Sequence, residues 1–451
     1  MKGLAMVAAA TLVASCSVAP PLQPAIVDAR LTGPFSPGIE VAGTPPPSQW
    51  WTLYGSPELD AHVERALSAN RDLEVALGNL AAARGAARAA NAQRQPEVVI
   101  ESGAGLIAAE RQPGTTTVIN TSYDLGGELA WEVDLFGRLK AGALAAQADA
   151  EASAAALAGV RVAVIADTVG AYADLCGAVA NARVTHALIS TQQRSVDVLE
   201  KQLATGEISS LEVAQARALL LRTQASLPTF EADRRRALLQ LAVLQGKPPS
   251  EAETFSRLRC VSAPRMSKPL AIGDGLGLIA RRPDVREAER RLAAATARLE
   301  VARAAVYPRI RVGTSAGMIG GALQGFVTPV ITWAFINPSR VRGQIAQAGG
   351  TAEAALANVD MVTLRALREV ETTLAELRAE RDRVARLSAA TDEARAAARR
   401  AAARVRIGEA VPTLQLDAER SLADTEQQLA IADLRRARLE VQLMRSVAAG
   451  A

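Results

Sequence analysis

Two stretches of the chain alternate between apolar and polar residues over many positions. Each stretch runs out and back around a loop that contains glycine. In the first stretch the apolar positions are Val98, Ile100, Ala104 and Leu106 on the way out, and Tyr123, Leu125, Leu129, Trp131 and Val133 on the way back. A period of two indicates strands with one apolar face. The pattern predicts two β-hairpins, at about residues 97–134 and 309–335.

A very long helix is predicted after each hairpin. No proline occurs between Pro113 and Pro228, or between Pro338 and Pro412. A helix over 138–203 would be roughly 100 Å long at 1.5 Å per residue. Apolar residues follow three- and four-residue spacing in both halves: Ile165, Val169, Tyr172, Cys176 and Val179, then Leu367, Val370, Leu374, Leu377 and Val384. With a glycine turn and a returning helix, this spacing predicts antiparallel coiled-coil hairpins.

The chain contains an internal two-fold repeat. One interval relates Leu80, Pro96 and Gly105 to Leu292, Pro308 and Gly317. A slightly shorter interval relates Trp131, Arg138, Gly206 and Glu207 to Trp333, Arg340, Gly408 and Glu409. Repeats of this kind indicate one supersecondary unit built twice. We therefore expect a first repeat at 57–262 and a second at 263–451, each with a helix, a hairpin and long coiled-coil helices.

The N-terminus has the pattern of a bacterial secretory signal. Lys2 precedes a short apolar run, which is followed by the small residues of "VASCS". Cys16 in this setting resembles a lipobox, which implies cleavage after residue 15, fatty acylation of Cys16 (palmitate among the chains) and an extended lipidated segment at 16–56. Ser17 resembles the pattern sent on to the outer membrane. The alternative is an ordinary signal peptide with a chance cysteine.

The sequence offers no enzyme chemistry. His62 and His186 have no metal-ligand partner three or four residues away, and no acid pair or triad has a plausible neighbourhood. Cys176 and Cys260 could pair in an oxidising compartment, but their contexts show no disulfide or metal spacing, so we expect two free thiols. A net charge of +4 is too weak to indicate nucleic acid. We expect no catalytic residue, no metal and no cofactor.

Four strands in one chain cannot close a membrane barrel, because lipid leaves no partner for the open edges. The strands of several chains must therefore combine, or the sheet does not lie in a membrane. A resemblance decides between these alternatives. The stretches "WWTLYGSPELD" (50–60), "WEVDLFGRLKA" (131–141), the helix that follows "RRPD" (281–284) and "LQLDAERSLADTEQQLAIA" (414–432) resemble TolC-like outer-membrane efflux proteins, most closely the lipidated OprM/NodT-type branch.

The resemblance implies a homotrimeric channel in the bacterial outer membrane. The expected fold class is mainly α with a β portion: a twelve-stranded barrel, four strands per chain, on a periplasmic helical tunnel. The expected function is the outer-membrane channel of a tripartite efflux system that exports drugs or other toxic compounds. Its partners would be outer-membrane lipid, a periplasmic adaptor and an inner-membrane pump of the RND type.

Three groups of site residues follow from the resemblance and the repeat. Trp131, Phe136, Trp333 and Phe335 would lie at the membrane interface, where amphipathic rings are favoured. The turns at Gly206-Glu207 and Gly408-Glu409 would form the periplasmic tips that contact the adaptor. Asp417 and Arg420, which share a helix face, would form the channel gate.

Some features depart from the family pattern. The second hairpin is short, "NPSR" (337–340) replaces an acidic-Gly-Gly-Arg pattern, and Pro329 falls inside the expected fourth strand, which leaves the limits of that strand open. Two other functions stay open: the outer-membrane component of type I secretion, and a periplasmic coiled-coil adaptor. An adaptor would not need two alternating hairpins that each end in tryptophan.

Overall fold

A computed structural model describes residues 46–110, 117–255, 260, 262–266, 277, 280–319, 322–333 and 338–450. The expected signal peptide, Cys16 and Phe335 lie outside the described residues. The chain forms two compact units. The first holds residues 78–156 and 284–362, and the second holds the rest of the described chain. Each sequence repeat contributes to both units.

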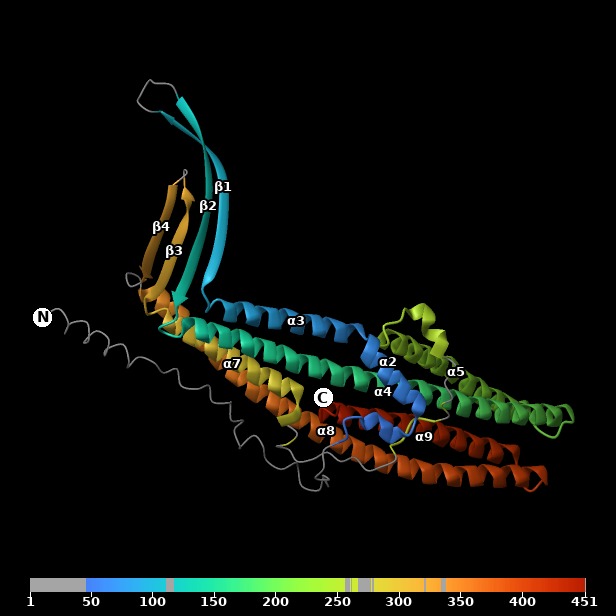
Figure 1. The fold of residues 1–451 in the computed structure, drawn as a ribbon. Helices are drawn as coiled ribbons and strands as arrows, with labels where there is room; N and C mark the ends of the chain where they lie inside the picture. The colour runs from blue at the N-terminus through green and yellow to red at the C-terminus, as the bar shows by residue number, and fades with distance from the viewer. Residues whose placement is uncertain are drawn as a thin grey trace. The chain divides into compact units, whose positions relative to one another are not determined.

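The first unit contains one antiparallel sheet with the strand order β1-β2-β3-β4 (Figure 1). Its strands are β1 (Glu97–Glu110), β2 (Thr117–Val133), β3 (Arg309–Ile319) and β4 (Ala322–Thr332). Pairing of β2 with β3 joins the two repeats. At the crossing of Gly126 and Gly317, a Cβ added to Gly317 would come within 2.6 Å of the Gly126 Cα, so only glycine allows the strands to approach this closely.

Pro329 lies within the fourth strand, opposite Val312. The ladder between β3 and β4 continues on both sides of it, with Thr328 opposite Gly313 and Val330 opposite Arg311. The proline therefore does not end the strand, which continues to Thr332.

Long helices make up most of the remainder. They are α2 (Pro57–Ala69), α3 (Arg71–Ala92), α4 (Arg138–Ala204), α5 (Ser210–Leu244), α7 (Pro283–Ala304), α8 (Pro338–Arg406) and α9 (Pro412–Ser446), with short 3₁₀ turns η2 (Trp50–Tyr54) and η3 (Pro249–Phe255). α4 has 67 residues and α8 has 69. With a rise of about 1.5 Å per residue, each helix is roughly 100 Å long. The predicted helical hairpins α4–α5 and α8–α9 are thus present.

The main core of the second unit confirms the predicted heptad positions. Buried members of those series are Ile165, Val169, Tyr172 and Cys176 in α4, and Val370, Leu374 and Leu377 in α8. The N-terminal elements close this core with Trp50, Leu59 and Val63. Burial of these apolar side chains stabilises the unit by about 25 cal/mol for each Å² of apolar surface removed from water.

The "RRPD" segment contains a buried arginine. Arg282 Nη1 donates a hydrogen bond to the Ser446 carbonyl at 2.5 Å, at the end of α9. Its Nη2 pairs with Glu369 Oε2 of α8 at 3.0 Å. A cation at a helix C-terminus satisfies an orphan carbonyl and the helix dipole together. Arg282 thus joins α8 and α9 just before α7 begins.

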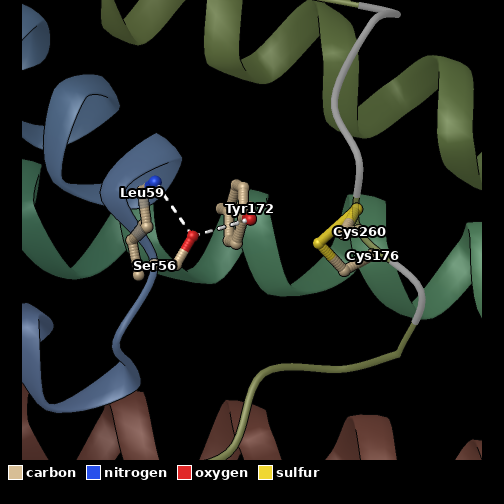
Figure 2. Close-up of a disulfide and its surroundings, with 5 residues drawn as sticks. All are labelled: Ser56, Leu59, Tyr172, Cys176 and Cys260. Carbon is tan, nitrogen blue, oxygen red and sulfur yellow. Dashed lines mark hydrogen bonds between the residues drawn. A yellow bond between two sulfur atoms is a disulfide. The ribbon is translucent and has the colours of Figure 1, made fainter.

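The prediction of two free thiols is wrong. Cys176 of α4 and Cys260 form a disulfide, with Cα atoms 5.2 Å apart (Figure 2). That separation suits a disulfide. The cysteines are 84 residues apart, so their local sequence contexts carried no sign of the contact. Nearby, the Ser56 hydroxyl accepts from the Leu59 N–H at 3.3 Å and lies 3.0 Å from the Tyr172 hydroxyl, which caps α2 against α4.

Removing this disulfide should destabilise the second unit. We expect Cys260→Ser to lower the free energy of unfolding by about 2–4 kcal/mol, because the crosslink restrains a long loop in the unfolded chain. Thermal unfolding of the detergent-solubilised protein measures the loss. A reductant should lower the midpoint of the wild type and leave that of the variant unchanged. Two reactive thiols in the denatured, unreduced protein would contradict the assignment.

Candidate functional site

The register of the sheet gathers apolar side chains on one face. Paired residues of antiparallel strands share a face. That face carries Val98, Ile100, Leu125, Leu129, Trp131, Ile310, Val312, Val327 and Ile331. Ile100 and Val327 are 77% and 74% exposed in the single chain. The opposite face carries Glu97, Glu101, Glu128, Glu132 and Arg311. An exposed apolar face this continuous marks a surface that is covered by lipid or protein.

The junction between β2 and α4 is held by local contacts. Gly137 adopts a left-handed φ of +74°, which turns the chain. The Asp134 carboxylate accepts hydrogen bonds from two backbone N–H groups in the first turn of α4, at 3.0 and 2.8 Å. Arg138 pairs with Glu132 at 2.7 Å. The segment "WEVDLFGR" therefore fixes how the strand passes into the helix.

The two predicted interface tryptophans occupy equivalent places. Trp131 Nε1 donates to the Arg94 carbonyl at 3.2 Å, and Trp333 Nε1 donates to the Val306 carbonyl at 3.1 Å. Both rings stay exposed at the end of a strand. This is the amphipathic placement that interfaces favour, with an apolar ring and a satisfied N–H.

The Phe136 ring stacks on Tyr307, with centroids 4.5 Å apart and planes 7° apart. Tyr307 is an aromatic residue that the sequence reasoning did not single out. Its signal was its position directly before Pro308, three residues after the end of α7, in a chain with only 3% aromatic residues. The contact joins the strand–helix junction of the first repeat to the helix–strand junction of the second.

The two predicted tips are the turns between the long helices, and both lie at the same end of the second unit (Figure 1). Gly206 and Gly408 have φ of +75° and +77°. The N–H of the next residue donates to a carbonyl five residues earlier, at 2.9 Å in each turn. This pattern ends a helix at a left-handed glycine. A Cβ at either glycine would meet nothing within 4 Å, so both turns are open in the chain.

The predicted gate residues form a surface pair within α9. Arg420 Nη1 donates to Asp417 Oδ1 at 3.3 Å, and both side chains are exposed. In the first repeat Arg217 instead reaches across the hairpin to Glu200 of α4, at 2.7 Å. An exposed pair of this kind contributes 1 kcal/mol or less within one chain. Any larger role of Asp417 must come from what it faces in an assembly.

A buried contact of Glu419, between Asp417 and Arg420 in the sequence, was missed by the sequence reasoning. Ser195 of α4 donates to Glu419 Oε1 of α9 at 2.8 Å. Gln415 donates to the same oxygen at 2.7 Å. Glu419 is buried, so its carboxylate depends on these two donors. The contact links the first repeat to the second near the tips, and nothing in the local sequence pattern indicates it.

The histidines show no sign of metal chemistry, and the described residues contain no cluster of three or more potential metal ligands. His62 is buried, and its Nδ1 lies 2.7 Å from Gln245 Nε2 of α5. Burial, and secondarily Arg65, lower the pKa of His62 to about 4. The ring is therefore neutral near pH 7 and serves the packing of α2.

One sheet with an apolar face, and a β-hairpin and a helical hairpin from each repeat, are the features of an outer-membrane channel. A model of the outer membrane efflux protein family matches residues 62–247 and 277–449. The chain therefore belongs to that family, whose members are channel proteins. This confirms the TolC-like resemblance drawn from the sequence.

The relatives and solved structures that resemble this chain are outer-membrane proteins. The pyoverdine export outer membrane protein OpmQ of Pseudomonas putida is 29% identical over 455 residues, covering 97% of this chain and 95% of the relative. Outer membrane protein OprJ of Pseudomonas aeruginosa is 29% identical, with 86% and 85% covered. The solved outer-membrane channel OprN is 34% identical, with a TM-score of 0.83 and coverage of 96% and 98%.

These findings confirm the predicted fold class and the channel function. The protein is an outer-membrane efflux channel of the trimeric TolC-like type, with a helical tunnel and a barrel to which each chain gives four strands.

Proposed function

We propose that the protein is the outer-membrane exit of a tripartite pump for small toxic molecules. An inner-membrane pump of the RND type would deliver the compounds, and a periplasmic adaptor would join pump and channel. The observation that carries this is the apolar face of the sheet on a chain whose relatives are named as efflux components. One of these, the toluene efflux pump outer membrane protein TtgF of Pseudomonas putida, is 28% identical over 98% of this chain. Such names favour efflux over type I secretion.

Expression in a bacterium that lacks its own efflux channel, together with the adaptor and pump of that host or of the source, tests this function. Restored resistance to small toxic compounds supports it. Restored export of a protein substrate alone would favour type I secretion instead.

The tip residues are proposed to contact the adaptor. Gly206, Glu207, Gly408 and Glu409 lie in open turns at one end of the second unit, where an end-on partner could reach them. Two turns per chain give six in a trimer. The left-handed glycines also end the helices, so they hold the turns in shape whatever else they contact.

Side chains at both glycines should therefore impair export without removing the trimer. Gly206→Val and Gly408→Val each force a β-branched residue into the left-handed region, at about 1–2 kcal/mol, and place bulk on an open surface. Resistance assays measure export, and detergent electrophoresis without heating measures the trimer. Gly170→Ala, in α4 with open space around it, is the control. Normal export by both valine variants would refute the role of the tips.

The gate proposal places three copies of Asp417 around the axis of the trimer. Carboxylates arranged in this way attract cations and resist anions. Arg420 of each chain would bridge neighbouring hairpins and help hold the tunnel shut. Both side chains are exposed in the single chain, and only the second repeat carries the acid.

Removing this pair should open and neutralise the constriction. We expect Asp417→Ala with Arg420→Ala to raise single-channel conductance in planar bilayers and to weaken cation preference. The matched control is Glu200→Ala with Arg217→Ala, which removes an exposed pair from the first hairpin. Unchanged conductance and selectivity in the Asp417 and Arg420 variant would contradict the gate.

The lipid anchor at Cys16 is proposed from the lipobox alone. Acyl chains contribute about 0.8 kcal/mol per buried CH₂, so two or more chains tether a protein stably. Mass spectrometry of the mature N-terminus should find acylated Cys16. Cys16→Ala should yield a longer or differently cleaved chain without acyl groups, whereas Cys260→Ser should keep them. A wild-type N-terminus without acyl groups would end the proposal.

A further inference from the structure

The two tips differ in their chemistry, although the repeat makes them equivalent in structure. We define the first tip as residues 193–212 and the second tip as residues 395–414, which the repeat aligns around Gly206 and Gly408. Val196, Leu199 and Val213 of the first hairpin share a small core with Leu416 of the second. The two tips therefore lie side by side at one end of the second unit.

Charge is the first difference. Between residues 395 and 408 the second tip carries arginines and no acid: Arg395, Arg399, Arg400, Arg404 and Arg406. The matching stretch of the first tip, 193–206, carries Arg194 and Lys201 with Asp197 and Glu200, which cancel. The second tip therefore presents a local positive potential that the first tip lacks.

Most of this charge is not neutralised within the chain. Arg395 pairs with Glu426 at 2.8 Å, and Arg404 comes only within 3.9 Å of Glu409. Arg399, Arg400 and Arg406 are exposed, and the described part of the chain places no acidic side chain in a salt bridge with them. At 100° per residue, Arg399, Arg400, Arg404, Arg406 and Ile407 fall within about half of the helix circumference. The four arginines form one exposed face of α8, and Ile407 follows directly after the helix ends at Arg406.

Exposed apolar residues are the second difference. Ile407 is 67% exposed and Val411 is 65% exposed, one on each side of Gly408-Glu409. In the first tip Thr205 takes the place of Ile407, and Ser209 takes that of Val411. At these two positions the second turn is apolar and the first is polar, whereas the exposed apolar residues of the first tip lie elsewhere, at Val198, Leu203 and Leu211.

The exchange of serine for valine at this turn also removes a side-chain helix cap, which lowers helix stability. Ser209 caps α5, because its hydroxyl accepts a hydrogen bond from the Leu211 N–H at 3.2 Å. Val411 holds the same capping position for α9 and makes no side-chain cap. Serine, threonine, aspartate and asparagine stabilise helices at this position, and valine does not. Val411 is therefore exposed without capping α9, and together with Ile407 it gives the second turn an apolar surface.

We propose that the second tip binds an acidic, partly apolar segment of the periplasmic adaptor, and that the first tip binds a segment without excess acid. Ile407 and Val411 would supply the apolar centre, and Arg399, Arg400 and Arg406 would surround it with charge. A desolvated apolar contact ringed by complementary charge gives both affinity and orientation. The two tips of each chain would thus distinguish two positions of the adaptor. This inference rests on the proposed contact between tips and adaptor.

Photocrosslinking tests the partner directly. The crosslinker p-benzoylphenylalanine replaces Ile407 in one variant and Thr205 in another, in cells that contain the whole pump, and mass spectrometry reads the crosslinked peptides. We expect an adaptor segment at Ile407 with at least two Asp or Glu within about one helical turn of the crosslink. We expect no such excess at Thr205.

The other outcomes count against the inference in different ways. An adaptor segment at Ile407 that is neutral or basic overturns it, and so does an adduct that joins two channel chains. An adaptor adduct at Thr205 alone also overturns it. In the neutral-segment and Thr205 cases the proposed tip contact stands. No adaptor adduct at either tip overturns both proposals.

Charge reversal supplies an independent measurement. The triple variant Arg399→Glu, Arg400→Glu, Arg406→Glu should lower resistance by about tenfold or more, since like charges would then meet. The control Arg365→Glu with Arg368→Glu, exposed on α8 outside both tips, should stay within about twofold of wild type. Both variants should form trimers in detergent, and the triple Arg→Lys variant should export normally. Equal loss of export by the reversal and control variants overturns the inference.

Rescue completes the test. Replacing the captured acidic residues of the adaptor with arginine should restore export to the triple glutamate variant and impair the wild-type channel. Failure of this exchange to restore export overturns the charge pairing.

Discussion

An open sheet edge cannot be left in lipid, and this constraint organises the whole chain. The four strands run in the order β1-β2-β3-β4, so β1 and β4 each leave one side unpaired in the described sheet. Backbone groups without partners cost several kcal/mol each in hydrocarbon. Strands of other copies must complete those edges, which the trimeric channel does with twelve strands. A single chain therefore forms only part of a barrel, and its exposed apolar face has a role only in the assembled channel.

The sequence predicted the elements whose signals are local. The period of two along residues 97–133 and the three- and four-residue spacing of Ile165, Val169 and Tyr172 both follow from one face being buried. The repeat predicted that Trp131 and Trp333 would have equal surroundings, and each donates to the carbonyl at the end of a preceding helical segment. Pro329 was a local signal for the end of a strand, but the pairing of β3 with β4 continues through it.

Contacts between distant residues could not be predicted in this way. The pairing of Cys176 with Cys260 depends on where the chain returns after η3, so the expectation of free thiols failed. The hydrogen bond from Ser195 to Glu419 joins the two repeats and has no counterpart in local spacing. Arg282 belongs to the "RRPD" segment, but only the fold shows that its guanidinium reaches Ser446 and Glu369. The roles proposed for the gate and tip residues depend on neighbouring chains and on the adaptor, so local sequence patterns do not specify them.

The central claim is that three copies close one barrel. Native mass spectrometry of the protein extracted in detergent, after signal processing, measures the number of chains in the particle most directly. The account predicts a single species with three chains. A monomer that keeps its sheet in detergent, or a particle with any other number of chains, would contradict it, because the edges of β1 and β4 would then be closed in some other way.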